Sequence, residues 1–243
     1  MPDAELVAAS STTTFQRIGS LRGDGPLGWP SLAYVRATGG GTGRFDDPRG
    51  ADSEYTVLYA SPDRRTCYLE TLDHFRIDAG FIARVAREMP LAAGGTDDLQ
   101  ALLTVEISES YFTKRIGAFR VEEAPTSLDV RLTATQTALS LSREPGIAQV
   151  LRALGYRRVT PGDLVGSERA LTQAVSLWAF RRGLGGIVYN SCHEPHDAVC
   201  WALFSHRGTR IGQTEPLAEI DRNDTELLAV ARQFNLIVPA PPK

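Results

Sequence analysis

The sequence predicts an α+β fold with one main domain. Short runs rich in β-branched and aromatic residues, which are typical of strands, are intermixed with stretches of helical apolar spacing. They do not follow the strand–helix–strand alternation of a doubly wound parallel sheet. The length of 243 residues fits a single domain, and 42% apolar with 23% charged residues is typical of a globular protein. A chain of this length buries enough apolar surface to fold without a disulfide or a metal.

The N-terminal part is predicted to hold two strands joined by a long loop. Residues 1–13 are rich in Ala, Ser and Thr and are expected to form a flexible leader. Residues 14–18 are predicted to form a short strand, and the β-branched and aromatic run 55–60 a second one. Between them, residues 19–54 hold nine glycines and three prolines. Loops of this length usually carry function or disorder.

The helix predicted after the second strand starts at a capping signal. Ser61 supplies an N-cap and Pro62 a first helical residue, and the helix is expected to run to His74 or Phe75. Apolar spacing predicts further helices at 80–89, 133–142, 145–154, 168–182 and 224–234. Strands are predicted at 99–107, 118–121, 128–130, 185–190 and 198–204. The proline-rich residues 239–243 form a non-helical tail, so the main domain spans 14–238.

Charge and cysteine content limit the classes of partner. The chain has 26 Lys and Arg against 29 Asp and Glu, so its net charge of −3 offers no general attraction to nucleic acid or to anionic lipid. Three cysteines are an odd number, which argues against a disulfide framework and for a reducing cytoplasm. The N-terminal residues lack the pattern of a signal peptide, and no apolar run has the length of a membrane span. We therefore expect a cytoplasmic protein with no direct nucleic-acid or membrane partner.

A glycine-rich run at residues 39–44, Gly-Gly-Gly-Thr-Gly-Arg, has two interpretations. It is not a phosphate-binding P-loop, because no Lys-Ser/Thr pair follows, and it lacks the strand and helix of a dinucleotide fingerprint. It is either a flexible surface loop or a segment whose glycines let the backbone approach a ligand. In the second case Arg44 would present its guanidinium group to a pyrophosphate.

The segment from Cys192 to His196, together with Cys200, invites a zinc or a nucleophile hypothesis. Both are weak, because the ligands crowd into one turn and Cys200 lies within an apolar strand, where cysteine behaves as a small apolar residue. Neighbouring residues on a strand point to opposite faces, so Cys192 and His193 are not expected to touch. No nucleophile elbow of the G-x-S-x-G type surrounds Ser191.

Five short motifs are more informative in order than singly. Alone, Arg17 is an ordinary strand residue, Tyr59 a core aromatic, and Glu70 a solvated acid opposite the apolar face of its helix. The motifs are Phe15-Gln16-Arg17-Ile18, Gly43-Arg44-Phe45, Val57-Leu58-Tyr59-Ala60-Ser61, Tyr68-Leu69-Glu70-Thr71-Leu72 and Gly186-Ile187-Val188-Tyr189-Asn190-Ser191. In this order they resemble the RES-domain family, which is named for an arginine, a glutamate and a serine.

The resemblance covers residues 14–75 and 168–204 and has consequences for the fold. It implies an ADP-ribosyltransferase-like arrangement of split mixed and antiparallel sheets flanked by helices. The segment 76–167 would be a long helical insertion. Phe45 stands where the family usually has tryptophan, and Asp46 where asparagine is common.

The same resemblance implies a site for NAD. The catalytic residues would be Glu70, Arg17 and Ser191, with no metal. Glu70 would hold a ribose hydroxyl and stabilise an oxocarbenium-like sugar, because its charge opposes the charge that develops there. Arg17 and Arg44 would bind the pyrophosphate, and Tyr59 would stack on nicotinamide or line its pocket. Ser191 would orient Glu70 or the ribose.

The implied function is cleavage of the nicotinamide–ribose bond by the toxin of a toxin–antitoxin pair. NAD would be the substrate, no further cofactor is expected, and water or inorganic phosphate would accept the ADP-ribosyl group. A small antitoxin would cover the site, and self-association is a further family expectation. The alternatives are a protein ADP-ribosyltransferase and a catalytically inactive module that binds a nucleotide or a partner.

Overall fold

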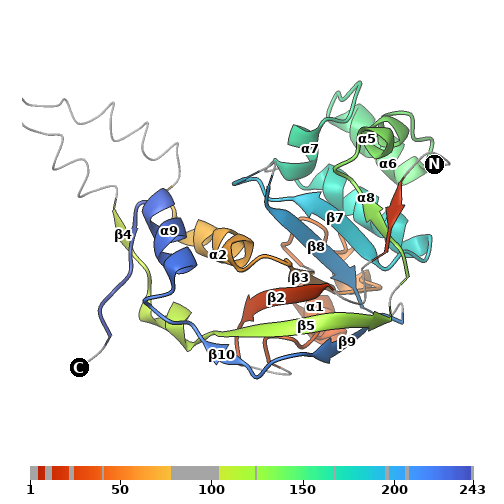
Figure 1. The fold of residues 1–243 in the computed structure, drawn as a ribbon. Helices are drawn as coiled ribbons and strands as arrows, with labels where there is room; N and C mark the ends of the chain where they lie inside the picture. Colours follow the sequence, from red (N-terminus) through yellow and green to blue (C-terminus); the bar gives the residue numbers. More distant parts are fainter. Residues whose placement is uncertain are drawn as a thin grey trace, which may run out of the picture.

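The fold is α+β, as predicted, and its strands form two main sheets (Figure 1). The computed structural model describes residues 5–8, 13–21, 25–39, 41–77, 104–123, 125–166, 168–194, 197–205 and 208–241. The helix expected at 80–89 lies outside these residues. None of the helices within them has both the length and the apolar character needed to cross a membrane.

The larger sheet has five strands in the order β1-β6-β7-β8-β3. Only β6 and β7 are parallel, and the other neighbours are antiparallel. Four strands match predicted ones, but β1 lies in the expected leader, where Leu6 pairs with Leu128 and corrects that expectation for these residues. The strands are β1 (Leu6–Val7), β6 (Ser127–Asp129), β7 (Gly186–Asn190), β8 (Val199–Phe204) and β3 (Val57–Ala60).

The second sheet is built around the long strand β5 (Arg115–Glu123). One edge of β5 pairs with β2 (Thr14–Gly19), and the other with β9 (Arg210–Gln213) and β10 (Ala218–Glu219). All these pairs are antiparallel, and β9 and β10 have no counterpart in the sequence prediction. A parallel pair of β4 (Val105–Glu106) and β11 (Leu236–Ile237) forms a further small sheet.

An isolated bridge between Gln16 and Ser61 joins the two main sheets where β2 and β3 meet. The backbones of the two residues exchange hydrogen bonds, with Gln16 N 2.7 Å from Ser61 O and Ser61 N 3.1 Å from Gln16 O. The Ser61 hydroxyl donates a 2.7 Å bond to Val199 O and accepts a 3.1 Å bond from Asp63 N, so it does not cap the following helix, which corrects the predicted N-cap. The cap is Asp63, whose carboxylate accepts a 2.8 Å bond from Thr66 N.

Helix α2 (Arg64–Leu72) follows this junction and packs on α9 (Thr225–Gln233) through buried Tyr68, Leu72 and Val230 (Figure 1). The 3₁₀ turn η2 (Asp73–Phe75) continues α2 to the predicted end. The amphipathic helix predicted at 224–234 and the predicted end of the helix after Ser61 are thus confirmed. The face of α2 opposite α9 is left free of this core.

The remaining helices pack mainly against the larger sheet. The predicted helices at 133–142, 145–154 and 168–182 are confirmed, and their apolar residues share one core with β6 and β7. They are α5 (Thr133–Ser140), α6 (Pro145–Ala153) and α8 (Ala170–Arg181), with the short α7 (Pro161–Val165) between them. Helix α1 (Leu32–Thr38) lies in the expected loop region and was missed, because it buries no residue and so has no apolar periodicity.

The segment 76–167 is a mixed part of the fold. Its described residues include the helices α5, α6 and α7, but also β5 and β6 and the 3₁₀ turn η3 (Glu109–Thr113). Because β5 pairs with β2, and β6 pairs with β7, this segment supplies strands to both main sheets. It is therefore integral to the core as well as a source of helices.

Candidate active site

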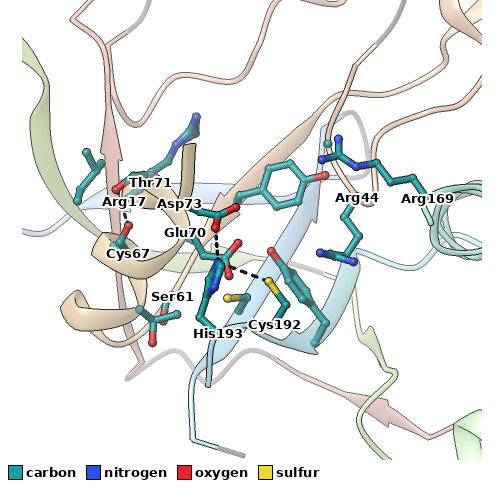
Figure 2. Close-up of a pocket in the computed structure, with 17 residues that line it drawn as sticks. Arg17, Arg44, Ser61, Cys67, Glu70, Thr71, Asp73, Arg169, Cys192 and His193 are labelled. Carbon is teal, nitrogen blue, oxygen red and sulfur yellow. Dashed lines mark hydrogen bonds and ion pairs between the residues drawn. The ribbon is translucent and has the colours of Figure 1, made fainter. Parts of the chain in front are cut away.

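A cavity of about 360 Å³ opens beside the junction of β2 and β3 (Figure 2). Its walls come from β2, β3, α2, the loop at residues 43–44, the end of β7 and the turn that follows it. Four of the five residues that the sequence singled out line it, namely Arg17, Arg44, Tyr59 and Glu70. They come from two strands, one loop and one helix, and their shared cavity supports the prediction that they form one site.

Glu70 reaches the cavity because of its position on α2. Thr66, Glu70 and Asp73 are spaced by four and three residues, so they lie on one side of the helical segment, and all three line the cavity. Glu70 is exposed and makes no hydrogen bond or ion pair with any residue that the structure describes. The exposure of Glu70 agrees with the periodicity of α2, but its side chain is exposed to the cavity.

Arg17 lies on β2 and is the least satisfied polar side chain of the site. Its Nη1 atom is enclosed and has no hydrogen-bond partner among the described residues. Burial lowers the pKa of Arg17 from its ordinary value, yet an arginine remains charged near neutral pH. A buried donor atom that is left without a hydrogen bond costs about 1–3 kcal/mol. An anion that enters the cavity would offset this cost.

The glycine-rich loop is packed tightly and is not a free surface loop. Asp46 accepts a 2.6 Å hydrogen bond from Gly43 N and a 2.9 Å bond from the Tyr59 hydroxyl. The same hydroxyl accepts a 2.9 Å bond from Phe45 N. A Cβ atom on Gly43 would lie 2.5 Å from the Tyr59 hydroxyl, and one on Gly41 only 2.0 Å from an Asp46 oxygen. Glycine is therefore needed here for close packing.

This loop carries Arg44 to the cavity wall. The Arg44 Nη1 atom donates to the carbonyl oxygen of Gly166, and Gln173 on α8 donates a 3.1 Å bond to the carbonyl of Gly43. The loop is thus held from two sides. The Tyr59 hydroxyl is already used in fixing the loop, and burial raises the pKa of Tyr59 well above its usual value. It therefore remains protonated and can donate to Asp46.

We expect Tyr59→Phe to loosen this loop. The change removes the hydroxyl that satisfies both Phe45 N and Asp46, so the free energy of unfolding should fall by about 1–2 kcal/mol. Misplacement of Arg44 should reduce kcat/KM of the reaction proposed below by about tenfold or more. Thermal unfolding and steady-state kinetics measure the two effects. Tyr34→Phe, at a tyrosine that is 68% exposed on α1, is the control and should change neither quantity.

Ser191 does not line the cavity. It is fully buried, its backbone N–H donates a 2.8 Å bond to Ala198 O, and its hydroxyl accepts a 3.2 Å bond from His193 N. The structure contains no hydrogen bond between Ser191 and Glu70. The placement of Ser191 therefore fits a residue that shapes the turn after β7, and this turn carries Cys192 and His193 into the cavity wall.

The structure also tests the cysteine and histidine hypotheses. Cys192 Sγ lies 3.4 Å from His193 Nε2, which corrects the expectation that they do not touch, because β7 ends at Asn190 and both residues lie in a turn. Burial raises the pKa of Cys192, and that of Cys67 to about 12. These thiols are protonated and poor nucleophiles. Among the described residues, no group of three or more His, Cys, Asp and Glu is arranged to hold a metal ion.

Four residues of the site were missed by sequence reasoning as site residues. Asp46 was noted only as a departure from the family pattern, and Asp73 could have been found from its spacing of three from Glu70. Tyr189 was assigned only to an apolar strand and not to the site. Arg169 lines the cavity from the residue before α8, and no sequence signal marks it.

The fold and the cavity together define an α+β protein whose site combines an arginine with one enclosed Nη1 atom and an exposed carboxylate, both without a hydrogen-bond partner at these groups among the described residues. The chain belongs to the RES-domain family, since the model of the RES domain matches residues 15–222. Among solved structures, it is similar to the crystal structure of the M. tuberculosis MbcT–MbcA toxin–antitoxin complex. The identity is 12%, the match covers 96% of this chain and 93% of that chain, and the TM-score is 0.49. No curated protein matches the chain.

Proposed function

We propose that this protein cleaves the nicotinamide–ribose bond of NAD. The observation that supports this most directly is that Arg17, whose enclosed Nη1 atom has no partner among the described residues, lines the same cavity as the exposed carboxylate of Glu70. The first group is suited to a pyrophosphate, because a guanidinium group keeps its charge and offers bidentate donors. The second is suited to a cationic sugar. NAD carries both chemical features.

The chemistry needs little more than these groups. The nicotinamide ring of NAD carries a positive charge that is neutralised when the ring leaves, so the leaving group needs no proton. The ribose passes through an oxocarbenium-like state, as in glycoside cleavage. The Glu70 carboxylate would hold a ribose hydroxyl and stabilise this cation, an interaction that strengthens as charge develops. Arg17 and Arg44 would anchor the pyrophosphate, and Arg169 adds a third positive charge to the cavity.

The acceptor decides the class of the enzyme. Water as acceptor makes it a glycohydrolase, and inorganic phosphate makes it a phosphorylase. No cofactor besides the substrate is required by this scheme, because bond cleavage involves no change of oxidation state.

We further propose that the protein acts as the toxin of a toxin–antitoxin pair. Membership of the RES-domain family supports this role, because characterised members of that family are toxins of toxin–antitoxin pairs that destroy NAD. An antitoxin would block the site most directly by placing an acidic or apolar element against the arginines of the cavity, and charge complementarity favours an acidic one. A chain that is active and that cells tolerate at high expression without a partner would contradict this dependence.

The central experiment is incubation of the purified chain with NAD in buffers with and without inorganic phosphate. We expect release of nicotinamide in both buffers for a glycohydrolase, with ADP-ribose as the second product. A phosphorylase would release nicotinamide only in the buffer with phosphate, together with ADP-ribose-1-phosphate, and the two products are separable by chromatography. Intact NAD under all conditions, with the protein folded and at high concentration, would contradict the proposed function. Transfer of ADP-ribose to an added protein, without release of the free sugar product, would favour the transferase alternative instead.

A further inference from the structure

A second carboxylate, that of Asp73, lines the same cavity as Glu70. Asp73 is the first residue of η2, three residues after Glu70, so the two side chains leave the same side of the helical segment. The Asp73 side chain is half exposed, whereas the imidazole of His193 beside it is only 6% exposed. A solvated carboxylate thus stands against a buried histidine at the cavity wall (Figure 2).

Contacts from two directions hold one oxygen of Asp73. Its Oδ1 atom lies 3.5 Å from His193 Nε2 and 3.3 Å from Arg76 Nη1. Phe234, at the end of α9, packs against both partners, with Arg76 4.7 Å above its ring and the His193 ring 5.1 Å away. Oδ2 makes no hydrogen bond or ion pair with any residue in the described ranges. The carboxylate is therefore oriented through Oδ1 and keeps Oδ2 available.

The hydrogen-bond roles of His193 follow from its other neighbour. Arg76 Nη1 lies 3.2 Å from His193 Nδ1, and a guanidinium group can only donate, so Nδ1 is the acceptor. The neutral ring then carries its proton on Nε2, on the side of Asp73 and Cys192. In this form His193 is a donor that supports the negative charge of Asp73. It is a positioning residue and not itself a base.

We propose that Asp73 is the general base of the reaction and that the acceptor it activates is water. This inference rests on the proposed cleavage of NAD. The bond between ribose C1′ and the nicotinamide nitrogen breaks, and its electron pair stays on that nitrogen. Water forms a new bond to C1′ through its oxygen, and one of its protons passes to Asp73 Oδ2. The products are nicotinamide and ADP-ribose, and the proton on Asp73 is then released to solvent.

The division of labour between the two carboxylates follows from their surroundings. Glu70 has no cationic partner among the described residues, so its charge is free to oppose the cationic sugar. Asp73 is oriented through Oδ1 by Arg76 and His193, which leaves Oδ2 to take a proton from water. A carboxylate suffices as the base, because water that attacks an oxocarbenium-like carbon becomes acidic as the new bond forms. Carboxylates act as such bases in glycoside hydrolysis.

The test uses Asp73→Asn, which keeps the size of the side chain but removes the base. In phosphate-free buffer we expect kcat for nicotinamide release to fall by about 100-fold. Sodium azide is an anionic nucleophile that needs no deprotonation, so it should restore the rate of this variant by about tenfold or more and yield ADP-ribosyl azide in mass spectrometry. Asp197→Asn, an exposed aspartate outside the cavity, is the matched control and should behave as wild type with and without azide.

Three results would overturn the inference. Asp73→Asn could be as fast as wild type, or it could be slow and folded, as judged by circular dichroism, without any rescue by azide. Wild type could also form only ADP-ribose-1-phosphate and stay inactive without phosphate, which excludes water as the acceptor. In each case nicotinamide is still released by wild type and the proposed function stands. A wild-type chain that leaves NAD intact contradicts both proposals, so the two failures are distinguishable.

Discussion

Glu70→Gln should lower kcat for nicotinamide release by about 1000-fold, because the amide has no charge to oppose the cationic sugar. Each tenfold loss corresponds to about 1.4 kcal/mol of barrier, so this carboxylate is expected to contribute about 4 kcal/mol. The fold should be unaffected, since Glu70 is exposed and pairs with no described residue. KM should change little if the pyrophosphate supplies most of the binding energy. Stopped assays of nicotinamide release with saturating NAD measure the effect.

The control for this prediction is Glu106→Gln, the same substitution at an exposed residue of β4. It should leave both kcat and the melting temperature unchanged. If Glu70→Gln consumed NAD at the wild-type rate, Glu70 would be misassigned, and the cavity would need a different source of charge stabilisation. Azide should not restore Glu70→Gln as it restores Asp73→Asn, because the missing element is charge and not a base.

Arg17→Met should lower the activity without lowering the stability of the protein. Within the part of the chain that the structure describes, the Nη1 atom of Arg17 is enclosed without a partner, and burial lowers the pKa of its guanidinium group. Methionine removes this unpaired charge and keeps much of the side-chain volume. The melting temperature should therefore stay the same or rise, as when buried charges are replaced by apolar residues.

The same variant should lose substrate recognition. The pyrophosphate would enter the cavity without its main partner, and breaking a buried charge pair costs about 3–5 kcal/mol. This corresponds to a loss in kcat/KM of about 1000-fold. NAD should raise the melting temperature of the slow variant Glu70→Gln, but it should not raise that of the double variant Arg17→Met with Glu70→Gln, which no longer binds the pyrophosphate.

Arg120→Met is the matched control, because Arg120 is an exposed residue of β5 in the same sheet as Arg17. It should change neither kcat/KM nor the melting temperature by a measurable amount. A large fall in the stability of Arg17→Met would show that the guanidinium group has a structural role. In that case Arg17 would stabilise the free protein, and its charge would not be reserved for a ligand.

Elements with strong local signals were predicted well from the sequence. The strands β3, β7 and β8 combine β-branched, aromatic and apolar residues, and α6, α8 and α9 have clear apolar spacing. Elements without such signals were missed. Helix α1 buries no residue, and the short strands β9 and β10 are defined mainly by pairing with β5, which is distant in sequence. The start of α2 was placed two residues too early, because the sequence does not show that the Ser61 hydroxyl donates to the distant carbonyl of Val199 while Asp63 caps the helix.

The sequence by itself determined the family and four residues of the cavity. The motifs that carry Arg17, Arg44, Tyr59 and Glu70 can be recognised from their order and spacing alone. Only the tertiary structure decided how these residues are used. Three features depend on packing between segments far apart in the chain: Arg17 Nη1 is enclosed with no partner among the described residues, Ser191 is buried outside the cavity lining, and Asp73 contacts His193. Local spacing sets which face of a helix or strand a side chain occupies, but its partners are set by what the rest of the molecule places opposite that face.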